Sequence, residues 1–373
     1  MTLPISPGIL RRHLLAAAAG SCAGLAPRLA FAQSPPVPIA DMHSHFGLLG
    51  RSPPSEPIAE DMRAERVALM AWSLPGDARW IRSDGNGIVQ VGVPPPGALS
   101  AFFRESLALM RAYVARSRLR AVLTPADVDA CIAGDAGVVL AAEGADFLEG
   151  RLEGLDAAVD QGLRHVQLVH FIRSLIGDFQ TEAPTHGGLS DFGRSVVAAC
   201  NAKGVLVDLA HCTPAGITQA LAVAKAPVVF SHGWVDHVEG SWSDGAGYLK
   251  RRISLAQAKQ IAAAGGVVGL WGLGLRSPGP SRTPGQGNWT VGRGDARGYA
   301  RELASLVSRL GEDHVAIGSD LHGVGADWSV NDYGHVRSVV ETLQGMKLST
   351  GAIEKVAYGN YARVLKAAMT RRG

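Results

Sequence analysis

The order of apolar and helical segments constrains the fold more than any other feature of this sequence. Short, almost uninterrupted apolar segments alternate with stretches in which apolar residues recur every three or four positions, the period of an amphipathic helix. Continuous apolar strands that alternate with helices indicate a parallel sheet covered on both faces. The eight candidate strands begin near Val37, Arg66, Gly137, Val166, Val205, Pro227, Gly266 and Val315.

Eight strand–helix units predict an α/β protein folded as a (β/α)8 barrel of the TIM type. The competing architecture is an open doubly wound sheet, which usually has a glycine-rich phosphate-binding turn after an early strand. The sequence contains neither a GxGxxG nor a GxxxxGK[ST] motif. We therefore expect a single barrel domain over residues 33–373, a length that is sufficient for one.

Side chains that bind metals stand where several of these strands end. The first strand, residues 37–46, ends in His43 and His45, and residues two apart on a strand point to the same side. Later strands run into further residues that bind metals or carry protons: Glu143, His170, His211, His232 and Asp320. Because the active site of such a barrel lies at the C-terminal ends of its strands, we expect these side chains to meet.

The residue types in this set indicate a metal centre. Imidazoles and carboxylates without paired thiolates suit zinc, and also iron, cobalt or manganese. Four of these five histidines, together with a central glutamate and a further aspartate, are more ligands than one open catalytic site needs. They are appropriate for two cations, about 3.5–4 Å apart, that share a carboxylate and hold a bridging hydroxide.

With these residues in view, the chain resembles the membrane (renal) dipeptidases, metal-dependent barrels of the amidohydrolase superfamily. The likeness covers essentially the whole mature chain, and its most specific parts are AAEGADFL, GLRHVQLVH, HGGLSDFGRSVVAACNAKGVLVDLAH, VVFSH, AAAGGVVGL, VAIGSD and YGNYARVL, in this order. The resemblance implies a zinc-dependent dipeptidase that hydrolyses the amide bond of a dipeptide through a metal-bridging hydroxide. It also implies two zinc ions and a homodimer.

The resemblance also implies a role for each metal ligand. His43 and His45 would bind one zinc ion, His211 and His232 would bind the other, and Glu143 would bridge the two.

Three further residues take catalytic or substrate-binding roles by the same resemblance. His170 would face the substrate carbonyl and stabilise the oxyanion, and Asp320 would take a proton from the bridging water and pass it to the leaving amine. The family binds the terminal carboxylate of the substrate with an arginine. The family's pattern places it at Arg251, with the adjacent Arg252 as the alternative.

The chain departs from the family at two positions. The first motif of the family is usually His-x-Asp, and here its second ligand is His45, which leaves the site one unit more positive. The usual Ser-Asp-Phe-Asp-Gly segment has His322 in place of its second acid. We expect His322 to face the substrate or to support a ligand, with a solvated loop histidine as the alternative.

The N-terminus has the features of an export signal. Arg11 and Arg12 precede an alanine-rich apolar run, and Ala30-Phe31-Ala32 forms a cleavage site. Residues 1–32 therefore predict a twin-arginine signal, with an ordinary secretory signal as the alternative. We expect an exported protein, periplasmic or secreted, without stable membrane insertion, because no later segment approaches about 18 uninterrupted apolar residues.

Nucleic acid is excluded as an expected partner. The net charge of +3 is small for 373 residues, and no basic block contains interleaved aromatic residues.

Two other functions remain open beside the dipeptidase. The changes at His45 and His322 are also compatible with a related hydrolase, either a lactonase or an N-acyl-amino-acid deacylase. The other alternative is an exported metal- or ligand-binding protein without turnover. Asp320 argues against that alternative, since a binding protein has no use for a proton carrier.

Some other polar residues give weaker predictions. Asp41 lies two residues before His43 on the same side of the strand, where it can orient a ligand imidazole. His165, His237, His314 and His335 are expected at the surface or at helix ends. Cys212 follows His211 and can line the site, although the cysteine spacing predicts no disulfide framework.

Overall fold

A computed structural model of the chain describes residues 36–45, 58–84, 87–236, 250–272, 275–276, 290–291, 295–323 and 330–370. The predicted export segment, residues 1–32, lies outside these ranges. Within them, no helix is both long enough and apolar enough to cross a membrane.

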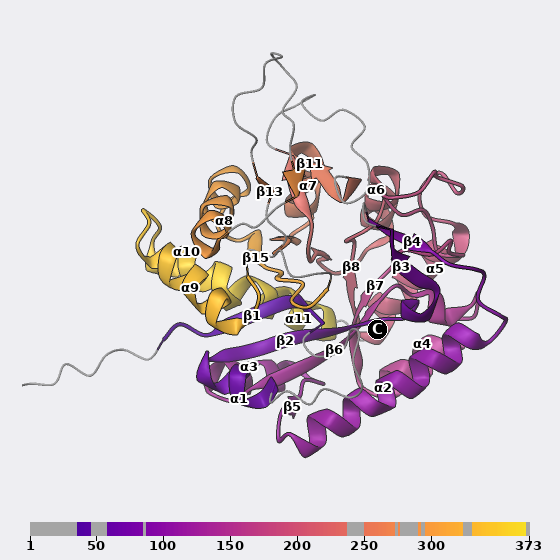
Figure 1. Cartoon of the computed structure of the whole chain (residues 1–373), viewed down its shortest axis with the longest axis horizontal. Coiled ribbons are helices and arrows are strands. Elements are labelled where there is room, and N and C mark those ends of the chain that lie inside the picture. Colours follow the sequence, from indigo (N-terminus) through magenta and orange to yellow (C-terminus); the bar gives the residue numbers. More distant parts are fainter. Residues whose placement is uncertain are drawn as a thin grey trace, which may run out of the picture. The chain divides into compact units, whose positions relative to one another are not determined.

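The parallel strands close into a barrel (Figure 1). Each strand pairs with the next one along the ring, and the first strand pairs with both the second and the last. The eight strands of the ring are β1 (Ile39–Ser44), β2 (Val67–Pro75), β6 (Gly137–Glu143), β7 (Leu163–Gln167), β8 (Leu206–Asp208), β9 (Val229–Phe230), β12 (Val267–Leu270) and β15 (Val315–Ile317). The predicted (β/α)8 barrel is confirmed, and each of the eight predicted strands is present.

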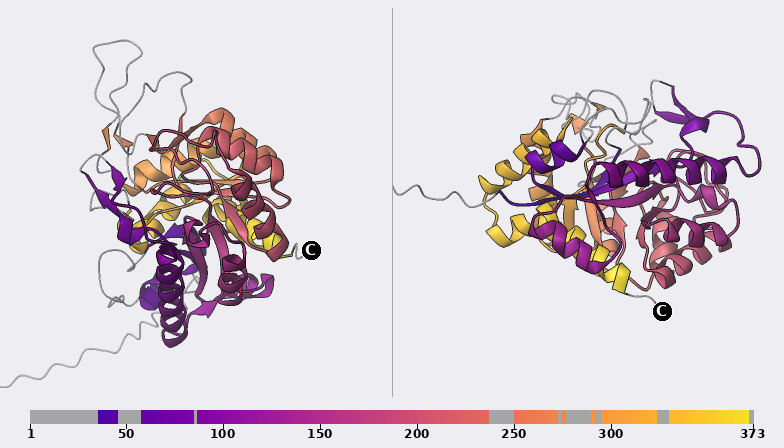
Figure 2. Two further views of the ribbon diagram at one scale, coloured as in Figure 1. Left: turned by 90° about the vertical axis from the view of Figure 1, so that its right-hand side faces the viewer. Right: turned by 90° about the horizontal axis from the view of Figure 1, so that it is seen from below.

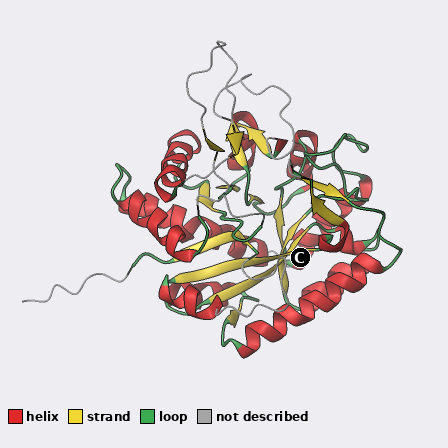
Figure 3. Cartoon of the chain, in the orientation of Figure 1, coloured by secondary structure: helices red, strands yellow, loops and turns green. Residues whose placement is uncertain are grey.

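Helices surround the sheet, as Figures 2 and 3 show. The larger helices are α2 (Ala98–Arg116), α3 (Pro125–Ala133), α5 (Asp191–Lys203), α6 (Pro214–Val223), α7 (Leu255–Ala263), α8 (Ala296–Leu310), α9 (Tyr333–Gln344) and α11 (Asn360–Thr370). Shorter helices are α1 (Ile58–Ala64), α4 (Glu153–Asp160) and α10 (Thr350–Glu354). Their apolar faces cover the barrel, so the strands are buried on both sides; all nine residues of β2 are buried. This double burial explains why the strands are continuously apolar.

The C-terminal helix α11 packs where the strands begin. The Asn360 side chain donates hydrogen bonds to the carbonyls of Glu312 and Val315, just before and at the start of β15. Arg363 donates to the carbonyl of Gly265, just before β12. The opposite ends of the strands, where the candidate residues stand, are therefore left for the site.

Two glycines let the last strands approach β9 closely. A Cβ atom added to Gly269 would lie 2.0 Å from the carbonyl oxygen of Ser231, and one added to Gly318 would lie 1.7 Å from the same oxygen. Both separations are far below van der Waals contact. Glycine at these positions brings Ser231 and its neighbour His232 into line with the other strand ends.

A short hairpin follows β2 on the side of the barrel where the strands end. Its antiparallel strands are β3 (Ile81–Ser83) and β4 (Ile88–Gln90). The 3-10 turn η1 (Ala78–Trp80) connects β2 to this hairpin.

Candidate metal centre and active-site cavity

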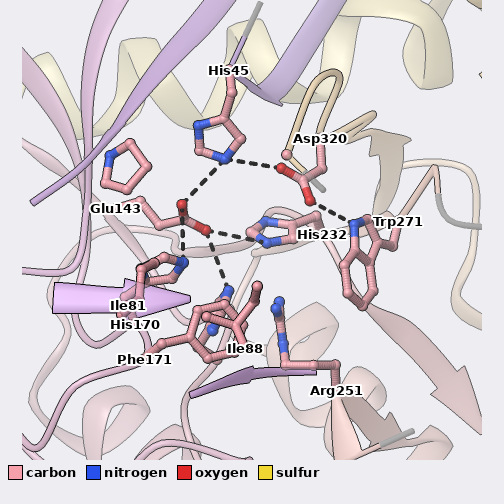
Figure 4. A pocket seen from close by; sticks show the side chains of 13 residues that line it. His45, Ile81, Ile88, Glu143, His170, Phe171, His232, Arg251, Trp271 and Asp320 are labelled. Carbon is pink, nitrogen blue, oxygen red and sulfur yellow. Dashed lines mark hydrogen bonds and ion pairs between the residues drawn. The ribbon is translucent and has the colours of Figure 1, made fainter. Parts of the chain in front are cut away.

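The strand ends enclose a cavity of about 60 Å³ (Figure 4). This volume accommodates ions and a few waters. The described residues that line the cavity are His45, Pro75, Ile81, Ile88, Glu143, His170, Phe171, His211, His232, Arg251, Trp271, Asp320 and Gly323. His43 lies against it, with Nε2 3.2 Å from His45 Nε2. All eight predicted site residues are thus brought together.

Glu143, at the end of β6, is the centre of the imidazole cluster. Its Oε2 lies 3.2 Å from His45 Nε2. Its Oε1 lies 3.4 Å from Nε2 of His43 and 3.3 Å from Nε2 of His211. The corresponding distance to Nε2 of His232 is 3.6 Å. Four imidazoles from strand ends around the barrel therefore converge on one buried carboxylate.

The donor atoms form two groups that share Glu143. One group is His43, His45 and Glu143, and the other is Glu143, His211 and His232; in each, the ligand atoms lie within 4.8 Å of one another. A third group joins His43 and His232 to Asp320. This arrangement matches two cations with a carboxylate bridge.

Buried nitrogens without partners support this fit. Among the described residues, neither ring nitrogen of His211 has a hydrogen-bond partner, and Nε2 of His232 has none. Leaving a buried polar atom unpaired costs about 1–3 kcal/mol, which a bound cation would remove. A donor set of imidazole and carboxylate is the one that zinc takes in catalytic sites.

Hydrogen bonds behind the ligands fix the orientation of the rings. His45 Nδ1 donates to the carbonyl oxygen of Ser73 at 2.7 Å, which leaves Nε2 as the free acceptor on the cavity side. The Ser73 hydroxyl contacts His43 Nδ1 at 3.1 Å, and the Ser231 hydroxyl contacts His232 Nδ1 at 2.9 Å. The three rings therefore present Nε2 to the cavity.

The pKa values show which charges the cluster favours. Burial lowers the pKa of His211 and of His232 well below the usual value, so both stay neutral, the form that binds metal. Burial alone would raise the pKa of Glu143, but the surrounding histidines, His170 first, hold it well below its usual value. Burial would likewise lower the pKa of His45, yet the charges of Glu143 and Asp320 raise it to about 10. The space between these two carboxylates and His45 thus favours positive charge, as a cation site requires.

Asp320 follows β15 in a left-handed conformation, with φ of +53°. Its backbone N–H donates to the His43 carbonyl at 2.8 Å, and its Oδ2 accepts from Trp271 Nε1 at 2.6 Å. Its other oxygen lies 3.0 Å from His45 Nε2. The carboxylate is therefore held at the edge of the cluster, where it can exchange a proton with water or substrate.

His170 lies three residues beyond the end of β7, next to Glu143. Its Nε2 is 3.2 Å from Glu143 Oε2, and its Nδ1 donates to Asp77 Oδ1 at 2.7 Å. Burial alone would lower the pKa of His170, but Asp77 and Glu143 raise it. A protonated ring here can donate a hydrogen bond into the cavity.

Arg251 is the arginine that the structure places in the cavity. It is 1% exposed, and its guanidinium carbon lies 4.8 Å from the centre of the Trp271 ring and 5.8 Å from that of Phe171. Arg252 starts β11 (Arg252–Ser254) and is not among the lining residues.

Some predictions outside the core of the site are wrong. Asp41 does not contact a ligand imidazole; its Oδ1 accepts instead from the backbone N–H groups of His43 and Ser319, at 3.2 and 2.9 Å. His165 is buried, because its Nδ1 contacts the Tyr361 hydroxyl and its Nε2 lies 3.3 Å from Asp208 Oδ2. Cys212 is buried behind the cavity and does not line it.

The other predicted loop histidines differ in what the structure shows. His322 is half-buried, with φ of +63°, next to the lining residue Gly323. His335 is about half exposed beside Asp332, which caps α9, in agreement with the prediction. His237 lies outside the described residues.

Four residues that orient the site were not predicted: Ser73, Asp77, Ser231 and Trp271. Asp77, Ser231 and Trp271 lie just beyond the end of a strand, and Ser73 lies near the end of β2. For Asp77, this position after a strand and the carboxylate side chain together could have indicated a role in the site.

Asp146, in the 3-10 turn η2 (Asp146–Leu148), gives a prediction about stability. Burial raises its pKa from 3.8 to about 7, against a hydrogen bond with Ser174 that favours ionisation. A carboxyl with a raised folded-state pKa stabilises the fold fully below about pH 4, and this contribution is lost as the pH rises to about 7. As the pH rises through that range, the free energy of unfolding of Asp146→Asn should therefore increase relative to that of wild type, by up to roughly 1.4 kcal/mol per pH unit.

Urea unfolding at several pH values measures this difference, with Asp156→Asn as the control at an exposed position. A difference between Asp146→Asn and wild type that does not change with pH would contradict the assignment.

Sequence comparison relates the chain to known proteins. Residues 62–372 match the profile of the membrane dipeptidases, peptidase family M19. Over 211 residues the chain is 30% identical to dipeptidase tcpJ of Claviceps purpurea, a match that covers 55% of this chain and 44% of the fungal protein. The chain thus spans less than half the length of that relative. Over 283 residues it is 26% identical to an uncharacterized protein in the pqqA 5′ region of Klebsiella pneumoniae, covering 73% of this chain and 97% of that protein.

Solved structures show the same fold. A metallopeptidase from Rhodobacter sphaeroides, liganded with a phosphinate mimic of the dipeptide L-Ala-D-Ala, superposes with a TM-score of 0.69 at 21% identity. The match covers 90% of this chain and all of that chain. An amidohydrolase from Pseudomonas aeruginosa gives a TM-score of 0.67 at 21% identity, covering 90% of this chain and 97% of that one.

Proposed function

The chain belongs to the membrane dipeptidase family, peptidase family M19, and from this premise we propose that it is a zinc-dependent dipeptidase. One observation carries the proposal: four ligand imidazoles surround the buried carboxylate of Glu143 in two groups, on a cavity that also holds His170, Asp320 and Arg251. The dipeptide mimic bound to the Rhodobacter sphaeroides metallopeptidase supports a substrate of this size.

His43, His45 and Glu143 would hold one zinc ion, and Glu143, His211 and His232 the other. Two zinc ions would polarise the scissile carbonyl and supply activated water as the nucleophile.

Two side chains of the protein then take part: His170 stabilises the developing charge and Asp320 transfers protons. His170 donates a hydrogen bond from Nε2 toward the carbonyl oxygen as negative charge develops there, because Nδ1 is already occupied by Asp77. Asp320 accepts the proton that water releases and delivers it to the nitrogen of the leaving amine. The Trp271 N–H holds the Asp320 carboxylate in place between these two steps.

Arg251 and an apolar wall would select the substrate. The guanidinium pairs with the terminal carboxylate, and it is rigid because it is packed against Trp271. Pro75, Ile81 and Ile88 line the same cavity and favour an apolar side chain on the substrate. Cleavage at internal bonds of long peptides is excluded because the terminal carboxylate would then not reach Arg251.

Replacing Arg251 tests this assignment. Arg251→Ala is expected to raise KM for a dipeptide such as Ala-Ala by about 10–100-fold, since a hydrogen bond to a charged group contributes about 1.5–3 kcal/mol. Steady-state kinetics should show no comparable effect on the C-terminal amide of the same dipeptide, which has no carboxylate. Arg252→Ala, the neighbouring control, should keep the wild-type KM. Equal losses on the dipeptide and its amide would show that Arg251 does not bind the carboxylate.

Hydrolysis of a panel of dipeptides, with and without a chelator, tests the proposed function itself. We expect release of both amino acids, loss of activity with chelator and recovery when zinc is added. Cleavage that is insensitive to the chelator would overturn the proposal.

A second candidate is hydrolysis of an N-acyl amino acid or a lactone at the same centre. Among the described lining residues the carboxylates are Glu143 and Asp320, and both already contact His45. Neither is left over to pair with the ammonium group of a dipeptide. Higher kcat/KM for N-acetylalanine or a lactone than for any dipeptide would favour this candidate.

A further inference from the structure

Asp77 is a buried carboxylate that directly supports the proposed oxyanion donor. It follows β2 and is 1% exposed. Its Oδ1 accepts from His170 Nδ1 at 2.7 Å, and its Oδ2 accepts from the backbone N–H of Phe171 at 3.1 Å. A buried carboxylate is costly unless both of its oxygens find partners, and here both partners belong to the same two-residue segment.

The backbone of this segment lies outside the strand ladder of the barrel, although its side chains are buried. His170 and Phe171 lie beyond the last residue of β7, Gln167, so the ladder of the barrel does not hold them. An imidazole ring in such a position can turn about its Cβ–Cγ bond and exchange its two nitrogens. The hydrogen bond to Asp77 makes Nδ1 the donor on one side and leaves Nε2 on the cavity side, 3.2 Å from Glu143 Oε2.

The Cβ atom of His170 is closely packed against Gly144, the residue that follows β6. Gly144 has φ of +87°, and a Cβ atom there would lie 3.2 Å from His170 Cβ. The glycine therefore leaves just enough room for His170 beside Glu143. Gly144 thus limits the space around His170 Cβ, and the hydrogen bond to Asp77 sets the orientation of the ring.

Asp77 also begins the segment that forms the apolar wall of the cavity. Its carbonyl accepts from the Trp80 N–H at 2.7 Å, which closes the turn η1 before β3. On the far arm of the hairpin, Gln90 Oε1 accepts from the backbone N–H of Arg173 at 2.9 Å. The hairpin is thus attached to the His170–Arg173 segment at two points, and only the first of them contacts His170.

We propose that Asp77 is a positioning residue for the reaction, which fixes the ring of His170 so that Nε2–H faces the carbonyl oxygen of the substrate. Asp77 does not touch the substrate, and its effect passes through His170. The predicted effect of Asp77 on kcat rests on the proposed function, whereas its predicted effect on the orientation of the His170 ring does not.

Kinetics of the zinc-loaded enzyme test the consequence. Asp77→Asn is expected to lower kcat for a dipeptide about 10–100-fold, the usual range for a residue that orients a functional histidine, with KM and zinc content unchanged. In a His170→Gln background the same substitution should change kcat less than about threefold, because its target is gone. The control Gln90→Ala removes the other attachment of the hairpin and should leave kcat at the wild-type value.

Two kinetic results would contradict the proposal. If the effects of Asp77→Asn and His170→Gln multiply, Asp77 acts independently of His170. If Gln90→Ala lowers kcat as much as Asp77→Asn, the loss of kcat comes from the altered attachment of the hairpin and not from the orientation of the His170 ring.

Nuclear magnetic resonance tests the orientation even if no dipeptide is hydrolysed. In zinc-loaded protein with ¹⁵N-labelled histidine, the Nδ1–H of His170 should give a downfield, slowly exchanging resonance, assigned by its absence in His170→Gln. Asp77→Asn should shift or remove this resonance, whereas Gln90→Ala should not. An unchanged resonance in Asp77→Asn would overturn the proposal, and absence of dipeptide hydrolysis in the wild type would instead count against the proposed function.

Discussion

Glu143→Gln is expected to lower the zinc content from two ions per chain to one or fewer and to reduce kcat/KM for a dipeptide by about 10³-fold or more. The amide is neutral and offers one acceptor oxygen in place of two. It can neither balance the charge of two divalent cations nor bridge them, although four imidazoles remain around it. Elemental analysis of the purified variant and steady-state kinetics measure the two effects.

Glu153→Gln provides the matched control, since Glu153 is exposed on α4 and is not among the residues that line the cavity. It should keep two zinc ions and full activity. If Glu143→Gln also kept both, Glu143 could not be the bridging ligand.

Asp320→Asn should lower kcat about 10²–10⁴-fold, the range that general acid–base catalysis contributes, with the zinc content unchanged. The asparagine keeps the shape of the side chain and can still accept from Trp271, but it cannot carry a proton at neutral pH. Because Asp320 also stands within reach of His43 and His232, zinc content is the decisive second measurement. Loss of zinc in proportion to activity would make Asp320 a ligand rather than a proton carrier.

The barrel could be predicted because its strands are buried on both faces. The nine buried residues of β2 leave no alternating pattern, and neither do those of β6. Strand boundaries were less predictable where polar residues enter the sheet. We expected a strand near Val166, but β7 begins at Leu163, since Arg164 donates to the carbonyls of Leu123 and Val159. A partner as distant in the chain as Leu123 cannot be recognised from a local pattern.

Several helices begin at residues whose side chains cap them, a signal that is visible in the local sequence. Ser190 caps α5 and Thr213 caps α6 by accepting hydrogen bonds from backbone N–H groups three residues on. The apolar pattern predicts a helical tail over residues 331–369, which the structure divides instead into α9, α10, a π-helical turn and α11; Ser349 caps the second helix. The helix α3 was missed, although Thr124 and Asp127 form a capping box at its start.

The site could be predicted because a barrel brings the ends of its strands together. His43, Glu143, His211 and Asp320 are far apart in the chain, yet each follows or ends a strand of the ring. The hydrogen bonds that orient these residues could not be predicted in the same way. The contact between Asp77 and His170 joins residues 93 positions apart, and it depends on the turn that follows β2.

The most direct test of the central claim is titration of zinc into chelator-treated protein while dipeptide hydrolysis is followed. The two ligand groups that share Glu143 predict no activity without metal and a rise that ends at two equivalents of zinc per chain. Full activity at one equivalent, or hydrolysis by the metal-free protein, would contradict the two-metal dipeptidase.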